Sequence, residues 1–298
     1  MTTRHVAIAA AVLLHLFALS LDAQLTQQML IQPTPQARQQ LTKTLQEYRA
    51  KNDVHGEAIT LLQLGMAEAA LGNADGARSN LLEAVGKMRS QNDPMGAWLA
   101  LFAVAQLEVT LGRPAEALPH VEKALALLNE TKVSTAPFSL RTMKTLGSAS
   151  GFSIPPGLDD SSAGMMKPML IQYSFEPMTH DLYGSVLTQV GQLDKAEAEL
   201  KAAAAGSIQS QGMYDFSIES HFGDLRVRQQ RYDAARTHYT KALSAVLKLP
   251  LPPMADQQIK AGIYDRLARL ETIAGRPEEA TRWFEKARGL GKSNTEKR

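Results

Sequence analysis

Five segments of the chain repeat one spacing of small and turn-forming residues, and this repeat constrains the fold more than any other feature. Each segment has a small residue inside an apolar-periodic stretch and a turn position seven residues later. The small residues are Gly65, Ala105, Gly184, Gly223 and Ala268, and the turn positions are Gly72, Gly112, Gly191, Gln230 and Gly275. Glycine readily adopts the left-handed conformation that ends a helix. The spacing therefore predicts a helix, a tight turn and a second helix in each segment.

The predicted second helices carry alanine in two columns, with a large residue between them. The alanines are Ala77, Ala117, Ala196, Ala235 and Ala280, then Ala84, Ala124, Ala203, Ala242 and Ala287, and the large residues are Leu81, Val121, Leu200, Tyr239 and Phe284. Positions three and four residues apart lie on one helix face. The small residues therefore let the two helices of a hairpin approach closely, and the large residue fills the gap to the next hairpin.

This pattern resembles the tetratricopeptide repeat over about residues 57–129 and 177–290. The stretches LGRPAEALPHVEKALAL and AGRPEEATRWFEKARGL are similar to the turn and second helix of that family. The family period is about 34 residues, whereas here Ala77 and Ala117 are 40 residues apart and Ala235 and Ala280 are 45 apart. The resemblance implies an all-α chain, an α-solenoid of about five helix-turn-helix repeats with longer helices or links. Residues 36–50 match a lone second helix, which predicts an N-terminal capping helix.

A long insertion is expected in the middle of the array, at residues 131–176. Ala117 and Ala196 are separated by about twice the local period, and the Ser-, Gly- and Pro-rich stretch 147–164 is typical of a loop. Met165, Met166, Met169 and Leu170 then form an apolar cluster. Two interpretations remain open. The segment is either a degenerate repeat whose methionines fill the gap where the stacking of the solenoid is interrupted, or a flap over a binding groove that contacts a partner.

The first 23 residues have the three-part organisation typical of a secretory signal peptide. Arg4 and His5 precede an apolar run at 6–19, which is shorter than a membrane-spanning helix, and small residues follow. Cleavage is expected after Ser20 or Ala23, which predicts a periplasmic or secreted protein with no stable membrane anchor after cleavage. The alternatives are an uncleaved anchor or a buried first helix. The sequence therefore predicts four regions: the signal peptide at 1–23, the capping helix with two repeats at 24–130, the insertion or degenerate repeat at 131–176, and three repeats with a polar tail at 177–298.

Nothing in the sequence indicates catalysis, a cofactor or a metal. The chain has no cysteine and a net charge of +2 without a basic cluster, so thiolate chemistry and a nucleic-acid surface are not expected. Phosphate-loop, zinc-protease and nucleophile-elbow motifs do not occur. His221 and His238, with Asp215 or Asp224, are the one combination that could form a weak metal site, and inter-helix packing explains them better.

The resemblance also implies which residues face a concave surface, because the first helices line it in this family. The predicted partner-binding groove consists of Ile59, Leu62, Met66, Leu99, Phe102, Gln106, Met178, Asp181, Ser185, Asp224, Asp265 and Arg269. Its N-terminal half is apolar and its C-terminal half is polar. The Lys and Asn that clamp a terminal carboxylate in some family members do not occur in these columns. The apolar half is either open to an apolar segment of a partner or covered from within by 36–50 or 165–170.

These observations favour an exported, non-catalytic scaffold that binds a protein or peptide of unknown identity through its concave surface. This step from fold to function is an analogy. Two alternatives stay open. One is a regulatory array for a separate enzyme, since similar long-period repeats often precede a caspase-like protease domain. The other is a protein that binds a small ligand or a peptide under the methionine-rich insertion. The sequence does not determine the oligomeric state.

Overall fold

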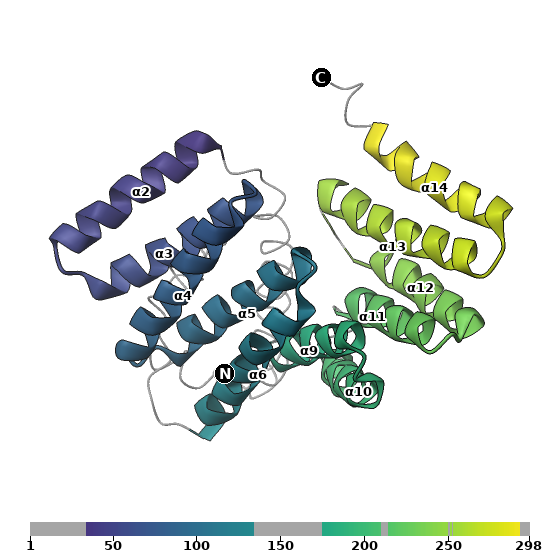
Figure 1. Ribbon diagram of the computed structural model, residues 1–298, viewed down its shortest axis with the longest axis horizontal. Coiled ribbons are helices and arrows are strands. Elements are labelled where there is room, and N and C mark those ends of the chain that lie inside the picture. Colours follow the sequence, from purple (N-terminus) through teal and green to yellow (C-terminus); the bar gives the residue numbers. More distant parts are fainter. Residues whose placement is uncertain (1–33, 134–174, 210–213, 250, 252, 293–298) are drawn as a thin grey trace, which may run out of the picture. The chain divides into compact units, whose positions relative to one another are not determined.

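The computed structural model describes residues 34–133, 175–209, 214–249, 251 and 253–292 (Figure 1). Every regular element in these ranges is a helix. The chain divides into two compact units, Met1–Leu182 and Tyr183–Arg298. The predicted signal peptide and most of the predicted insertion, including its methionine cluster, lie outside the described residues.

The first unit begins with a single helix and continues with two hairpins. The capping helix α2 spans Pro35–Ala50 and packs on α3, as the sequence predicted. The first hairpin pairs α3 (Val54–Ala70) with α4 (Ala74–Ser90), and the second pairs α5 (Pro94–Thr110) with α6 (Pro114–Val133). Helices of 17 residues in α3, α4 and α5 explain why the repeat is longer than about 34 residues.

The second unit contains the three remaining hairpins. They are formed by α9 (Glu176–Val190) with α10 (Leu193–Gln209), α11 (Asp215–Arg228) with α12 (Tyr232–Val246), and α13 (Pro253–Ile273) with α14 (Pro277–Lys292), as Figure 1 shows in green to yellow. The first turns of α9 still belong to the first unit. The 21 residues of α13 account for the longest step between repeats. The predicted all-α solenoid of helix-turn-helix repeats is therefore confirmed.

All five predicted turn positions have the left-handed backbone conformation. Gly72, Gly112, Gly191 and Gly275 have φ angles of 80°, 70°, 85° and 73°, and Gln230 has 58°. Such a residue lets the chain reverse while the last helical carbonyls still accept hydrogen bonds. Asn52 and Asn92 have the same conformation in the turns that enter the first two hairpins. The turns are thus set locally, by residues that tolerate a positive φ.

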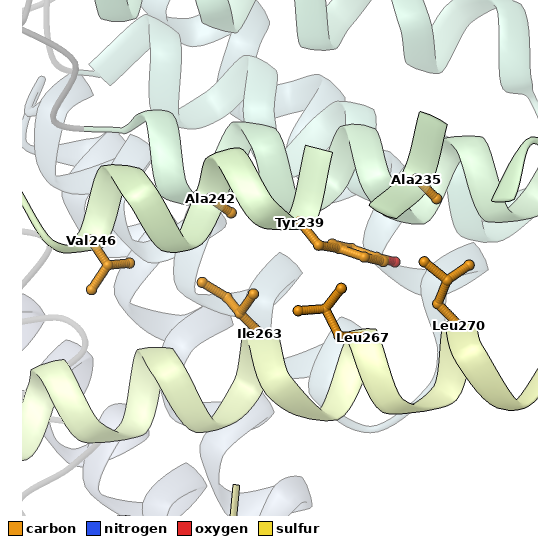
Figure 2. Close-up of a cluster of buried hydrophobic side chains, with 7 residues drawn as sticks. All are labelled: Ala235, Tyr239, Ala242, Val246, Ile263, Leu267 and Leu270. Carbon is orange, nitrogen blue, oxygen red and sulfur yellow. The ribbon is translucent and has the colours of Figure 1, made fainter. Parts of the chain in front are cut away.

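The alanine columns lie where the helices of the array pack against one another. Ala77, Ala117, Ala196 and Ala235 are completely buried. A Cβ built on Gly65 would lie 2.6 Å from the Leu81 side chain, and one on Gly184 would lie 2.6 Å from Leu200. Figure 2 shows the other side of such a large residue, between α12 and the following helix α13, where Tyr239 lies between Ala235 and Ala242 of its own helix and faces Ile263 and Leu267. Small residues therefore create the space, and the large residue of each repeat fills it.

Ion pairs link the second helix of one repeat to the first helix of the next. Arg38 pairs with Glu68 at 2.8 Å, Arg78 with Glu108 at 2.5 Å, and Arg236 with Glu271 at 2.6 Å. The three glutamate side chains are 7%, 1% and 1% exposed. Between α10 and α11 the polarity is reversed, because Glu197 pairs with Arg226 at 2.7 Å. The two positions are equivalent in all four pairs, so these pairs join neighbouring helices at one register while the sign of each partner can change.

Within the first unit, the start of α9 is anchored to α5. The Trp98 indole N–H donates to the Thr179 hydroxyl at 2.9 Å, and the Trp98 and Phe175 rings are 4.7 Å apart. Trp98 is only 1% exposed. Residues 81 positions apart in the chain are thereby joined, so the array resumes directly on α5 after the 134–174 segment.

Candidate protein-interaction surface

The predicted groove residues of α3 and α5 are largely enclosed by the chain itself. Ile59 and Leu62 are 2% and 0% exposed, and Leu99 and Phe102 are 6% and 3% exposed. Met66 and Gln106, one turn further along each helix, are half-buried. A partner could reach the four apolar side chains only after a rearrangement. In this structure the four side chains form part of the hydrophobic core.

The predicted residues on α9 are buried as well. Met178 and Asp181 are each 6% exposed, and Ser185 is 7% exposed. Thr188, one turn beyond Ser185, donates its hydroxyl hydrogen to the Gly184 carbonyl at 2.8 Å. Asp181, Ser185 and Thr188 are all buried, so they offer little surface to a partner.

An accessible row of side chains does run along α13 in the second unit. Its members project within about 120° of one another at 100° per residue. We call this row the α13 stripe, and it comprises Gln258, Gly262, Asp265, Arg266, Arg269, Thr272 and Ile273. The Arg269 side chain is 72% exposed, that of Asp265 is 43% exposed, and Ile273 is 56% exposed. Asp265 and Arg269, which the sequence predicted, thus lie on an open surface.

Asp224 on α11 extends the stripe and is held in place by two partners. Its carboxylate accepts a hydrogen bond from the Tyr239 hydroxyl at 2.7 Å and from Arg266 Nε at 3.2 Å. Burial, together with the Asp224 charge, raises the pKa of Tyr239, so the phenol keeps its proton and remains a donor. The predicted groove residue Asp224 and the unpredicted Arg266 are therefore oriented by a buried tyrosine.

The remaining groups of the stripe are less constrained and face solvent. Arg269 Nε donates to Asp265 at 2.7 Å in an exposed pair one helical turn apart, which contributes little to stability. Beside it, Gly262 has no side chain, and the nearest atom to an added Cβ would be Arg266 Nη1 at 3.8 Å. The glycine leaves this edge of the guanidinium uncovered. The stripe therefore presents two carboxylates, two guanidiniums and an apolar end at Ile273.

Sequence reasoning missed Gln258, Arg266 and Ile273. It placed one row of residues on each first helix, and in the last repeat that row gave Asp265 and Arg269. An open helix face is wider than one column, because residues up to about 60° on either side remain accessible. Arg266 follows Gly262 by one helical turn, and this spacing could have indicated that Arg266 lies on the same face. Ile273 is an apolar residue just before the helix-ending turn, where a buried position was equally compatible with the sequence.

The candidate metal ligands make other contacts. His238 Nδ1 lies 2.6 Å from Glu219, and its ring stacks on Phe222 at 5.2 Å. Asp215 accepts a hydrogen bond from Ser207 at 2.7 Å, and Asp224 is occupied as described above. Over the described ranges, no group of three or more His, Cys, Asp or Glu residues could hold a metal ion. None of the described helices is long and apolar enough to cross a membrane.

Comparison with known proteins supports the fold and does not assign a family. No family model matches the chain, and no curated protein matches it in sequence. BtubC (BKLC) from P. vanneervenii is structurally similar, with a TM-score of 0.54, 15% identity, and coverage of 87% of this chain and 91% of that chain. MamA gives a TM-score of 0.40 at 13% identity, covering 78% of this chain and 97% of that chain. At such identities the similarity of BtubC supports the helical-repeat fold alone.

Proposed function

We propose that this protein is an exported, non-catalytic scaffold that binds a protein or peptide through the α13 stripe and Asp224. The observation that carries the proposal is the contrast between first helices. The predicted groove positions of α3, α5 and α9 are mostly buried, whereas the α13 stripe is accessible over about four turns and its central polar groups are oriented from beneath. A surface with oriented donors and acceptors loses less conformational entropy on binding.

The chemistry of the stripe favours a segment of mixed charge with one apolar anchor. Arg266 and Arg269 can donate to carboxylates or to backbone carbonyls, and Asp265 can accept from amides or cations. Ile273, at the end of the stripe, provides apolar area for a partner side chain. A helix or an extended peptide can both make such contacts along a helix face.

Site-specific photo-crosslinking tests this surface in the intact chain. A photo-reactive amino acid at Arg269 or Thr272 should crosslink to a discrete partner, whereas the same residue at Lys241, exposed on the second helix α12, should not. Once the partner is purified, R269A and R266A should each weaken its affinity by about tenfold, and K241A should leave the affinity unchanged. Equal crosslinking at Arg269 and Lys241, or equal affinities for all three variants, would refute the assignment.

Export is tested separately, because it rests on the N-terminal sequence. Fractionation of a bacterial host should place the protein outside the cytoplasm, and N-terminal sequencing should begin at Leu21 or Gln24. A mature chain that retains Met1 in the cytoplasmic fraction would refute export and leave the binding surface unaffected.

A further inference from the structure

The guanidinium of Arg266 on α13 is held at one edge and open at the other. Its Nε donates to both carboxylate oxygens of Asp224 at 3.2 Å, and the Tyr239 hydroxyl holds that carboxylate from beneath at 2.7 Å. The Arg266 side chain is 37% exposed. Within the described residues, no hydrogen bond reaches its two Nη nitrogens, and neither of them is buried. The group is therefore oriented from one side and unoccupied on the other.

A gap lies beside this open edge. An arginine side chain on a helix lies back over the preceding turn, and here that turn contains Gly262. A Cβ added to the glycine would lie 3.8 Å from Arg266 Nη1, its nearest neighbouring atom. At the position of Arg266, the earlier repeats carry Gln63, Ala103, Leu182 and His221. A guanidinium with no side chain in front of it therefore occurs at this place only in the last repeat.

The unmet hydrogen-bonding capacity around Arg266 consists mainly of donors. A guanidinium has several N–H donors and no acceptor. Arg269, on the same face and about 4.5 Å further along the axis, donates its Nε to Asp265 at 2.7 Å, and its Nη nitrogens also make no hydrogen bond within the described residues. Both oxygens of Asp224 already accept hydrogen bonds. A ligand that satisfies these groups must therefore bring an acceptor.

We propose that Arg266 binds one aspartate or glutamate side chain of the partner, which rests on the α13 stripe being the partner-binding surface. A carboxylate has two coplanar oxygens, and these can accept from Nη1 and Nη2 of one guanidinium at once. Such a contact needs a fixed guanidinium plane, and Asp224 and Tyr239 fix it before the partner arrives. The acidic residue is internal to the partner segment, because the stripe continues on both sides of Arg266, to Gln258 and to Ile273.

Selection from a peptide library against the purified full chain tests the proposal. The peptides are displayed with their carboxyl end fused, so that only side chains can supply a carboxylate. Peptides that the wild type retains and R269A loses should share an acidic residue at one position. Such peptides without a shared acidic residue would overturn the carboxylate assignment and leave the stripe as the binding surface. If neither R269A nor R266A lost any of the selected peptides, the stripe itself would be wrong.

A thermodynamic cycle with one selected peptide then assigns the contact to Arg266. Replacing the acidic residue of the peptide by its amide should weaken binding to the wild type by about tenfold or more, because a charge-assisted contact is lost. The same replacement should change binding to R266Q by less than about threefold. An equal loss on the wild type and on R266Q would overturn the proposal. Circular dichroism shows whether R266Q remains folded.

G262E is a second variant, which leaves Arg266, Asp224 and Tyr239 in place. A glutamate four residues before an arginine pairs with it on a helix, so the introduced carboxylate should occupy the open edge and reduce the preference for the acidic peptide to about threefold or less. G262Q has the same size without the charge and should keep most of the preference. Both variants replace a helical glycine by a better helix former, so neither should lower the thermal unfolding temperature. A full preference on G262E, or its equal loss on both variants, would contradict the proposal.

Discussion

The ion pair between Arg78 and Glu108 provides a sharp test of how the repeats hold their register. Two guanidinium nitrogens, Nε and Nη2, contact the Glu108 carboxylate at 2.5 and 2.9 Å, and the glutamate side chain is only 1% exposed. R78E would leave that buried carboxylate facing another negative charge. Breaking a buried pair costs about 3–5 kcal/mol. Because Arg78 is 27% exposed, we expect the lower end, about 3 kcal/mol.

The reversed pair in the same chain makes the prediction stronger. Glu197 and Arg226 occupy the equivalent positions with opposite charges and still form a 2.7 Å contact. The double reversal R78E/E108R should therefore restore most of the stability, to within about 1 kcal/mol of the wild type, although each single reversal is destabilising. On the same helix, the exposed Arg89 is a matched control, and R89E should cost less than about 1 kcal/mol.

The chain offers a convenient probe for this measurement. It contains two tryptophans, Trp98 in the first unit and Trp283 in the second. In a W283F background, urea unfolding followed by fluorescence reports the first unit alone, and circular dichroism reports both. If R78E/E108R is as unstable as the sum of the two single reversals, the pair does not set the register and the reasoning is refuted.

Three further predictions address packing, hydrogen bonding and pH. G223A should destabilise the second unit by about 1–3 kcal/mol, because its methyl group overlaps the Tyr239 ring; thermal unfolding measures this, and no loss would contradict the close contact. W98A should cost about 3–5 kcal/mol through the cavity it leaves, and W98F less, because it removes mainly the donor to Thr179; equal losses in urea unfolding would contradict this. Hydrogen bonds from Arg226 and then Lys201 lower the pKa of Glu197 from its ordinary value of 4.5 to about 2. The stability from this group should therefore be complete above about pH 4.5 and lost as the pH falls toward 2, since the unfolded chain binds the proton first; E197Q should show a smaller loss over that range, and parallel pH curves would contradict the assignment.

The sequence determined the elements of the fold because their causes are local. A positive φ at Gly72 or Gly275 depends on the residue itself, and the alanines at three- and four-residue spacing identify one helix face wherever they occur. The capping helix at 36–50 could be predicted for the same reason, since it matched the column pattern of the later repeats. Even the long period has a local cause, the length of the helices.

The candidate surface depended on tertiary structure, because exposure is a property of what packs around a residue. By periodicity, Phe102 and Asp265 occupy equivalent columns, yet Phe102 is 3% exposed and the Asp265 side chain is 43% exposed. The same holds for Phe284, which is 38% exposed although its column is buried wherever another helix follows. The sequence by itself determined the repeat, its turns and its helix faces, since these follow from backbone conformation and side-chain size. Only the tertiary structure decided which of those faces stay open, because burial sums contacts from residues far apart in the chain.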